Sequence, residues 1–493
     1  LTRRNFIASA GFATVAGMSA PSFLLTNRQQ SQGRQSVIRV PLCVQPVFLY
    51  ESYERKTAAS WRTTGGIHGE AEAENEKQRI GTELAQIQAA ADFPLEVRPL
   101  VSVATADQAA ALASKNHDVL LMYATRRNPR VMEALAAPGK WNLIFVRHES
   151  GPTYYMYVGV HAHFFRKGRD QFSQPGMDVN DVIVDDQDEI AWRLRALCGL
   201  KNILGKRIVA VGGPGGWGAD GNEAPDMARK RWNLDIQSVS YPELGERIKQ
   251  ARADSGLVNR CRSEAEQYLR HDSVTLNTTG EFVQKAFLLR EIFLDLLDEA
   301  KTDAITINEC MSTIMPISET TACLPLALLN DAGYLAFCES DFVVIPSRIL
   351  LHYVSGLPVF LCNPSFPHKG VVTVSHCTAP RRMNGKDLEP VNILTHWESD
   401  YGAAPKVEME KGRPVTVLNP DFAGQRWLGF EGEILETPSH PLCRTQLDLR
   451  IRGDWKHLIN EIRGFHWMVA YGNHLRGIEY ALRKAGIDWL GLS

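Results

Sequence analysis

The sequence lacks a surplus of charge of either sign: 54 lysines and arginines stand against 56 aspartates and glutamates, a formal net charge of −2. So balanced a chain has no bulk attraction for nucleic acid or for an anionic membrane, and we expect neither as a partner. It also lacks CxxC pairs, although it contains nine cysteines. An odd number without regular spacing argues against a disulfide framework and against a zinc site built from cysteine alone.

Two common catalytic signatures are missing as well. There is no GxSxG motif, which argues against a serine hydrolase of the Ser-His-Asp type. The glycine-rich stretch "VGGPGGWGAD" satisfies G-x-G-x-x-G with Gly213, Gly215 and Gly218, but no G-K-[ST] follows it. The acid expected at the end of the next strand is absent too, because Asp235 stands at that strand's beginning. We therefore predict a turn or a cleft wall here, rather than a dinucleotide site.

The first residues have no apolar run long enough to cross a membrane well. Arg3 and Arg4 precede a short run rich in glycine and alanine, and "TRRNFI" resembles a twin-arginine export signal. An ordinary helix start with two basic residues is the alternative. We expect residues 1–36 to be signal and linker, the mature protein to be periplasmic or otherwise extracytoplasmic, and no integral membrane segment to remain.

Apolar runs of strand length alternate with helical segments through the first 354 residues. Strands are expected within residues 37–44, 95–103, 118–124, 142–148 and 154–160, then within 206–213, 234–241, 303–308 and 334–337. A long helix is expected over residues 281–301. Strands that are apolar on both faces and alternate with helices are typical of parallel sheets covered by helices.

The sequence pattern changes near residue 355, after which short predicted strands are separated by Gly/Pro turns. At 493 residues the chain is also too long for a single core. We predict an α/β protein with two doubly wound parallel-sheet domains, at 37–200 and 201–354. A β-rich, barrel-like C-terminal domain with a closing helix should follow, at 355–493.

Several acidic residues stand at predicted strand ends. Glu309 follows residues 303–308, Glu319 lies in the next loop, and Glu339 and Asp341 follow residues 334–337. Carboxyl ends of parallel strands meet at one edge of a sheet, where ligands bind. Such a cluster would repel itself unless a divalent cation neutralised it. The alternative is that one or two of these residues cap helices.

Histidines offer a nitrogen donor for the same site. His376 ends the run "GVVTV", and His466 begins another apolar run, "WMVAY". A histidine in an apolar setting is otherwise a hydrogen-bonded core residue. Because an acidic cluster is expected nearby, His376 and His466 are also candidate ligands of a borderline metal ion.

Four motifs together resemble the L-fucose isomerase family and its arabinose isomerase relatives. They are the C-E-x-D segment at 338–341, the H-C-x-x-P turn at 376–380, the segment "KGRPVTV", and a late histidine, His466, before Tyr471-Gly472. The resemblance is good over about residues 300–480. It implies two α/β domains followed by a β-rich domain, and manganese held by two carboxylates and a histidine.

Carried over by position, Asp341 matches the family's second acidic ligand and His466 its histidine ligand. Glu309 is our choice for the first acidic ligand, because a strand end is more rigid than a loop, and Glu319 is the alternative. Glu309 and Asp341 are thereby also the expected catalytic carboxylates, with Glu339 and His376 as supporting or substrate-contacting residues.

The resemblance implies a metal-dependent aldose–ketose isomerase that acts on a small sugar or polyol through an enediol, using Mn²⁺ or another divalent ion. We expect a homo-oligomer. The export signal departs from the family, whose familiar members are cytoplasmic. The alternatives are an exported sugar-binding protein of the same fold without turnover, and a nicotinamide-dependent oxidoreductase. Presence of Asp341 and His466 favours an enzyme over the binding protein, and the missing ribose acid disfavours the oxidoreductase.

Overall fold

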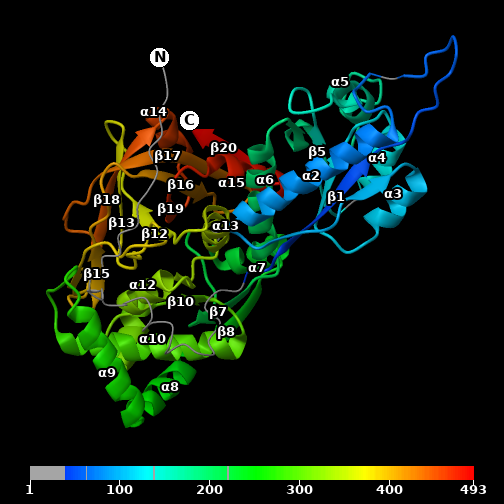
Figure 1. The fold of residues 1–493 in the computed structure, drawn as a ribbon. Helices are drawn as coiled ribbons and strands as arrows, with labels where there is room; N and C mark the ends of the chain where they lie inside the picture. The colour runs from blue at the N-terminus through cyan, green and yellow to red at the C-terminus, as the bar shows by residue number, and fades with distance from the viewer. Residues whose placement is uncertain (1–38, 63, 137–138, 219–220, 493) are drawn as a thin grey trace, which may run out of the picture. The chain divides into compact units, whose positions relative to one another are not determined.

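The first sheet of the computed structural model is parallel and lies within residues 42–184 (Figure 1). The structure describes residues 39–492 except 63, 137–138 and 219–220, so the predicted signal at 1–36 lies outside the described residues. The strand order is β2-β1-β4-β5-β6, and β3 also pairs with β1. The strands are β1 (Leu42–Leu49), β2 (Leu95–Val97), β3 (Val101–Val103), β4 (Val119–Tyr123), β5 (Trp141–Val146) and β6 (Val182–Val184). Every residue of β4 is buried, as expected for a strand covered on both faces.

Helical segments accompany this sheet, and one of them replaces a predicted strand. They are α2 (Glu70–Ala90), α3 (Ala106–Ala113), α4 (Pro129–Leu135), α5 (Tyr155–Gly159), the π-helix η1 (Val160–Phe165) and the 3₁₀ turn η2 (Val179–Asp181). The strand predicted at 154–160 is therefore wrong. Met156 and Gly159 are buried while Tyr157 and Val158 are exposed, a helical spacing that overrides the strand propensity of this tyrosine- and valine-rich run.

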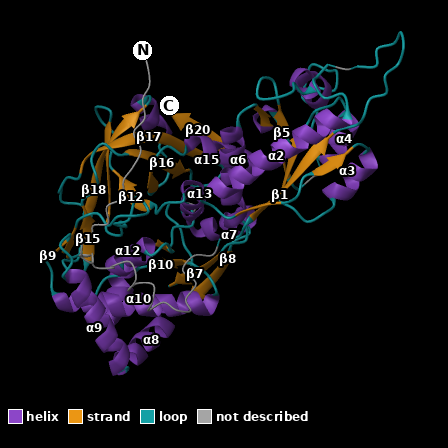
Figure 2. Cartoon of the chain, in the orientation of Figure 1, coloured by secondary structure: helices purple, strands orange, loops and turns teal. Residues whose placement is uncertain are grey.

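The second sheet is also parallel, with the order β11-β10-β7-β8. Its strands are β7 (Arg207–Val211), β8 (Asp235–Val239), β10 (Ala304–Ile307) and β11 (Leu335–Phe337). Helices α8 (Tyr241–Ala253), α9 (Ser255–Leu269) and α10 (Gly280–Ala300) lie together on one side of this sheet (Figure 2). The remaining helical segments of this region are η3 (Gly221–Glu223), α7 (Ala224–Trp232), the π-helix η4 (Cys310–Ile314), α11 (Met315–Ser318), α12 (Cys323–Asp331) and α13 (Ile345–Ser355).

The C-terminal region contains a closed antiparallel barrel. Six strands pair in the ring β16-β19-β12-β13-β18-β17, which closes because β17 pairs with β16, and β20 adds to β17 in parallel. The strands are β12 (Phe360–Pro364), β13 (Val371–His376), β16 (Pro414–Pro420), β17 (Arg426–Glu436), β18 (Thr445–Arg452), β19 (Trp467–Tyr471) and β20 (Asp488–Leu492). The predicted fold class, two parallel-sheet α/β regions followed by a barrel-like one, is confirmed.

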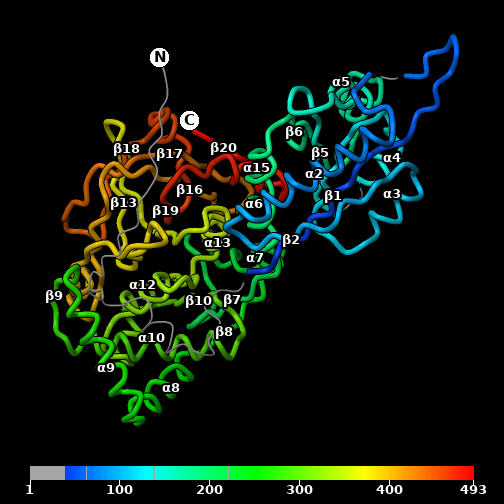
Figure 3. Tube along the Cα trace, viewed as in Figure 1, coloured from blue at the N-terminus to red at the C-terminus, as the bar shows by residue number. Residues whose placement is uncertain are grey.

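The regions are joined through shared elements. Helix α6 (Gln187–Ile203), which contains the boundary predicted at residue 200, packs on both α13 and α15 (Leu475–Ala485) (Figure 3). Strand β9 (Val274–Leu276) pairs with β14 (Val391–Leu394), which pairs with β15 (Ala404–Val407). Helix α14 (Trp455–Glu461) precedes β19. The helix expected to close the chain is α15, and the strand β20 follows it. The domain boundaries themselves stay predictions.

Among the described residues, no single helix combines the length and the apolar composition needed to cross a bilayer. One bent pair, Cys310–Ser318 with Cys323–Asp331, meets those criteria only when its two helices are taken together, and they meet at 89°.

Candidate metal centre

The segment after β11 turns sharply and lies against the glycine-rich loop after β7. Glu339 and Ser340 have φ angles of 69° and 44°, in the left-handed region that non-glycine residues rarely adopt. Each such residue costs about 1–3 kcal/mol, and this conformation is concentrated at functional sites. The turn is held by the loop, because Gly215 donates to the Ser340 carbonyl at 3.2 Å and Phe342 donates to the Gly215 carbonyl at 3.0 Å.

The carboxylate of Asp341 is buried and holds a histidine. Its Oδ1 accepts the backbone N–H groups of Trp217 and Val343, both at 3.2 Å. Its Oδ2 lies 2.7 Å from Nδ1 of His466. The carboxylate of Asp341 accepts no backbone N–H group of α13, whose N-cap is Val344 without a side-chain hydrogen bond, so its hydrogen bonds hold the turn and the glycine loop. It also fixes the orientation of the imidazole that the resemblance pairs with it.

His466 is buried directly before β19, and its second nitrogen faces Glu339. Its Nε2 lies 3.2 Å from Oε2 of Glu339, yet this nitrogen is buried without a hydrogen bond of good geometry. Burial acts to lower the pKa of His466, but the hydrogen bond with Asp341 and the charge of Glu339 outweigh burial and raise the pKa to about 9. The protein without metal therefore holds an imidazolium between two carboxylates.

His376, the last residue of β13, approaches Glu339 from another side. Its Nε2 lies 3.6 Å from Oε1 of Glu339, and its Nδ1 lies 2.9 Å from the hydroxyl of Thr378. The two imidazole rings are 6.2 Å apart between centroids. Glu339 thus offers one carboxylate oxygen to each histidine. The ligand atoms of Cys338, Glu339 and His376 also lie within 4.8 Å of one another.

Glu339 is ionised in this setting. Burial acts to raise its pKa, but hydrogen bonds and charge from His376 and His466 hold the pKa well below its usual range. The side chain of Glu339 is 33% exposed, whereas the side chains of His466 and Asp341 are each 1% exposed. Glu339 is therefore the member of the group that solvent and ligands reach.

The two glutamates proposed as the first acidic ligand lie apart from these contacts. Glu319 pairs with Lys285 at 2.7 Å and with Arg252 at 3.1 Å, so two cations already neutralise its charge. Glu309 is exposed, and within the described part of the chain its carboxylate makes no hydrogen bond or ion pair with Asp341 or His466. Both have left-handed backbone, with φ of 44° at Glu309 and 54° at Glu319. The structure thus brings together Glu339, Asp341, His376 and His466, and the choice between Glu309 and Glu319 stays a prediction.

The glycine-rich loop lies against the turn that contains Glu339. A Cβ at Gly212 would lie 2.1 Å from the hydroxyl oxygen of Tyr241, and one at Gly218 would lie 2.3 Å from the ring of Phe422. These glycines therefore allow close approach of other groups. Asp235, at the start of β8, pairs with Arg207 at 2.5 Å. The interpretation of this loop as a turn or a cleft wall stays a prediction.

Three residues that were not among the predicted site residues also lie beside this group. Trp217 and Phe465 are 46% and 48% exposed, and their rings lie 5.6 Å apart, with Trp217 5.9 Å from His466. Cys338 adds a thiol beside Glu339. The signals were present in the sequence: Trp217 sits within the glycine loop, while Phe465 and Cys338 directly precede His466 and Glu339.

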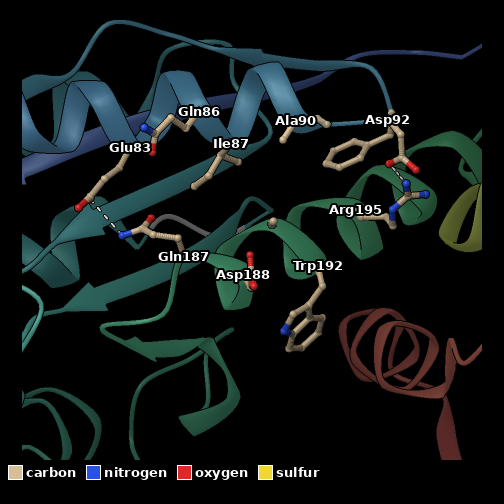
Figure 4. A pocket seen from close by; sticks show the side chains of 12 residues that line it. Glu83, Gln86, Ile87, Ala90, Asp92, Gln187, Asp188, Trp192 and Arg195 are labelled. Carbon is tan, nitrogen blue, oxygen red and sulfur yellow. Dashed lines mark hydrogen bonds and ion pairs between the residues drawn. The ribbon is translucent and has the colours of Figure 1, made fainter. Parts of the chain in front are cut away.

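A separate groove of about 490 Å³ lies between α2 and α6 (Figure 4). Trp192 and Ile87 contribute apolar surface, while Asp92 binds Arg195 and Glu83 accepts from Gln187 at 3.0 Å. No residue of the Glu339 group lines this groove. We favour the Glu339 group as the functional site, because its ionisable side chains converge and perturb one another.

The donor set fits a divalent metal ion. The imidazole of His376, the ionised carboxylate of Glu339 and the thiol of Cys338 suit borderline ions better than calcium or magnesium. The second imidazole, that of His466, faces the other oxygen of the same carboxylate but is not part of that close group. The buried Nε2 of His466, without a well-formed hydrogen bond, is the nitrogen that a metal would take. Asp341 bound to Nδ1 matches the carboxylate that commonly supports a metal-binding histidine. Searches against models of known protein families and against curated proteins found no match for this chain.

Proposed function

We propose that this chain is a divalent-metal-dependent aldose–ketose isomerase that acts on a small sugar or polyol. One observation carries the proposal: a single ionised carboxylate, Glu339, lies at a strand end and faces the Nε2 atoms of both His376 and His466. In the family that the motifs resemble, the C-E-x-D segment follows a strand and its aspartate is a metal ligand. The ion is held by Glu339, His376 and His466, with Asp341 positioning His466.

This ligand set differs from the one that the resemblance implies. Asp341 already accepts three hydrogen bonds, so it acts through His466 rather than directly. A bound divalent ion would polarise the carbonyl and hydroxyl oxygens of the substrate. The thiol of Cys338 adds a softer donor, which favours zinc over manganese within the divalent series.

Proton transfer between C1 and C2 needs a carboxylate outside the metal set. Strands β10 and β11 are parallel neighbours, and Glu309 follows the last residue of β10 by two positions, as Glu339 follows β11. Both glutamates therefore stand at the same edge of the sheet. We assign to Glu309, which is exposed, the role of taking the proton from one carbon and returning it to the other.

The experiment is elemental analysis of the purified chain, followed by incubation with a panel of aldoses in D₂O. Isomerisation through an enediol exchanges a carbon-bound hydrogen of the sugar for solvent deuterium, which mass spectrometry detects. We expect about one divalent ion per chain and deuterium incorporation into at least one aldose–ketose pair. Metal-replete protein that converts no aldose of the panel to its ketose would refute the isomerase.

A second candidate function follows from the same contacts. Because His466 can carry a charge between Asp341 and Glu339, the group can neutralise itself without a metal. The chain would then be a protein that binds a sugar without converting it. Sugar binding by calorimetry, unaffected by a chelator, would favour it over the enzyme.

A further inference from the structure

Three cysteines lie close to the segment that contains His376. Cys377 directly follows that histidine, Cys323 begins α12, and Cys443 lies just before β18. Cys323 and Cys377 are buried in one apolar cluster with Ala404, and the partly exposed Cys443 packs against it. Nothing in the proposed isomerase uses these thiols, although all three are free.

Cys377 and Cys323 are buried in the same cluster, and Cys443 packs against that cluster. The Sγ of Cys377 also accepts the backbone N–H of Arg444 at 3.4 Å. The antiparallel pairing of β13 with β18 matches His376 with Thr445, so the segments that hold Cys377 and Cys443 lie side by side. A disulfide between Cys377 and Cys443 would therefore join two segments that already pack together, and it requires Cα atoms about 4.4–6.8 Å apart.

We propose that Cys377 and Cys443 form a reversible disulfide, which makes this pair a site of oxidative modification next to the metal centre. Cys443 is assigned as the entry thiol because it is the one that solvent reaches, whereas Cys323 and Cys377 are 4% and 2% exposed. Cys323 stays reduced, held in the start of α12.

The reaction is a thiol–disulfide exchange with a small disulfide oxidant, RSSR. The Cys443 sulfur attacks one sulfur of RSSR, forms a mixed disulfide and releases RSH with the proton of Cys443. The Cys377 sulfur then attacks the Cys443 sulfur and expels the second RSH, which takes the proton of Cys377. Two protein thiols are oxidised by two electrons, and one RSSR is reduced to two RSH.

The exchange should be slow. Cys377 is 2% exposed, so an oxidant reaches the pair only through the partly exposed Cys443. This protects the pair from brief exposure to oxidant.

Closing the disulfide should also act on the site. Cys377 adjoins His376, whose Nε2 lies 3.6 Å from Glu339, so drawing Cys377 toward Cys443 displaces that imidazole. This coupling rests on the proposed metal centre, whereas the disulfide itself does not. We expect the affinity for Zn²⁺ or Mn²⁺ to fall about tenfold on oxidation and to return on reduction.

The test incubates the full chain with oxidised glutathione, alkylates the remaining thiols in denaturant and maps the peptides without reduction. We expect a linked pair of peptides containing Cys377 and Cys443, with the other cysteines alkylated. Cys443→Ser should abolish the linkage and keep the fold, because the side chain is partly exposed. Cys43→Ser, which removes another partly exposed thiol on β1, should leave the linkage unchanged.

Three results would overturn the modification site: nine alkylated cysteines after prolonged oxidation, a Cys323–Cys377 linkage in its place, or a glutathione adduct on Cys443 that never resolves. A mapped Cys377–Cys443 disulfide with unaltered metal affinity would overturn the coupling. If neither redox form binds metal, the proposed function fails while the peptide map still decides the disulfide.

Discussion

Nδ1 of His466 lies 2.7 Å from Oδ2 of Asp341, across 125 residues of sequence. This contact joins the turn after β11 to the start of β19, and so ties the second parallel sheet to the barrel. It also sets which nitrogen of His466 is free. With Nδ1 engaged by Asp341, Nε2 faces Glu339.

Asp341→Asn should weaken metal binding about 10–100-fold while preserving the fold. The asparagine oxygen can still accept from Trp217 and Val343, but its amide would donate to Nδ1. The ring proton then moves to Nε2, which can no longer bind metal. Isothermal titration with Zn²⁺ and Mn²⁺ measures the change.

Asp331→Asn is the matched control. Asp331 is another carboxylate that accepts two backbone N–H groups, from Arg381 at 2.6 Å and Arg382 at 2.8 Å, and burial raises its pKa to about 6. No histidine depends on it for orientation. Equal loss of metal affinity in both variants would show that Asp341 acts only by holding the turn.

His376→Gln and His466→Gln should each lower metal affinity more than tenfold, because each removes one of the two nitrogens that face Glu339. His117→Gln, at a buried histidine of the first α/β region, should leave metal affinity unchanged. Full metal affinity in His376→Gln would show that His376 is not a ligand. The ligand set that the resemblance implies, Asp341 and His466 with Glu309 or Glu319, would then be favoured.

The elements that could be predicted are those in which local pattern and burial agree. The runs that became β4, β10 and β11 are buried along their whole length, so their apolar sequences suffice to identify them. The gathering of Glu339 and Asp341 at a strand end followed from the same reasoning. Strand β20 could not be found in this way, because its pairing with β17 makes a strand of a short terminal run.

The site's internal arrangement depended on contacts that no pattern contains. The backbone N–H of Trp217 reaches Asp341 across 124 residues, and only the fold of the glycine loop puts it there. This contact turns Asp341 toward His466 and leaves Glu339 as the exposed carboxylate. Glu319 looked equivalent in the sequence, but Arg252 and Lys285 on neighbouring helices neutralise it.

The metal-free protein should lose stability as pH rises from about 6.5 to about 9. The folded pKa of His466 is raised to about 9 from an ordinary 6.5, so protonation stabilises the folded state fully below 6.5 and no longer above 9. The difference is on the order of 3 kcal/mol. Urea unfolding across this range, with a chelator present, measures it.

His466→Gln should flatten that pH dependence. His352→Gln should not, because burial lowers the pKa of His352 to about 4 and this histidine is neutral in both states above pH 6.5. A slope that survives in His466→Gln would assign the effect to another group.

Export should depend on the two arginines of the predicted signal. Changing Arg3 and Arg4 together to lysine should hold the protein in the cytoplasm, because the apolar run after them is too short and weak to act alone. Fractionation of cells that express each form measures the distribution. Continued export of the double variant would mean that this segment is an ordinary helix start.

Gly212→Ala should destabilise the fold and disturb the metal centre, whereas Gly213→Ala should cost less. Both glycines have left-handed backbone, with φ of 79° and 89°, so the conformational strain of alanine is similar at the two positions. Only at Gly212 does the added Cβ meet another group, the hydroxyl oxygen of Tyr241 at 2.1 Å, while the space around Gly213 is open. The clash should add about 1–3 kcal/mol of destabilisation, measured as the difference in unfolding free energy between the two variants.

Because the loop then shifts against the Ser340 and Asp341 backbone, metal affinity should fall in Gly212→Ala alone. Equal behaviour of the two variants would show that the loop is an independent turn and not a wall of the site.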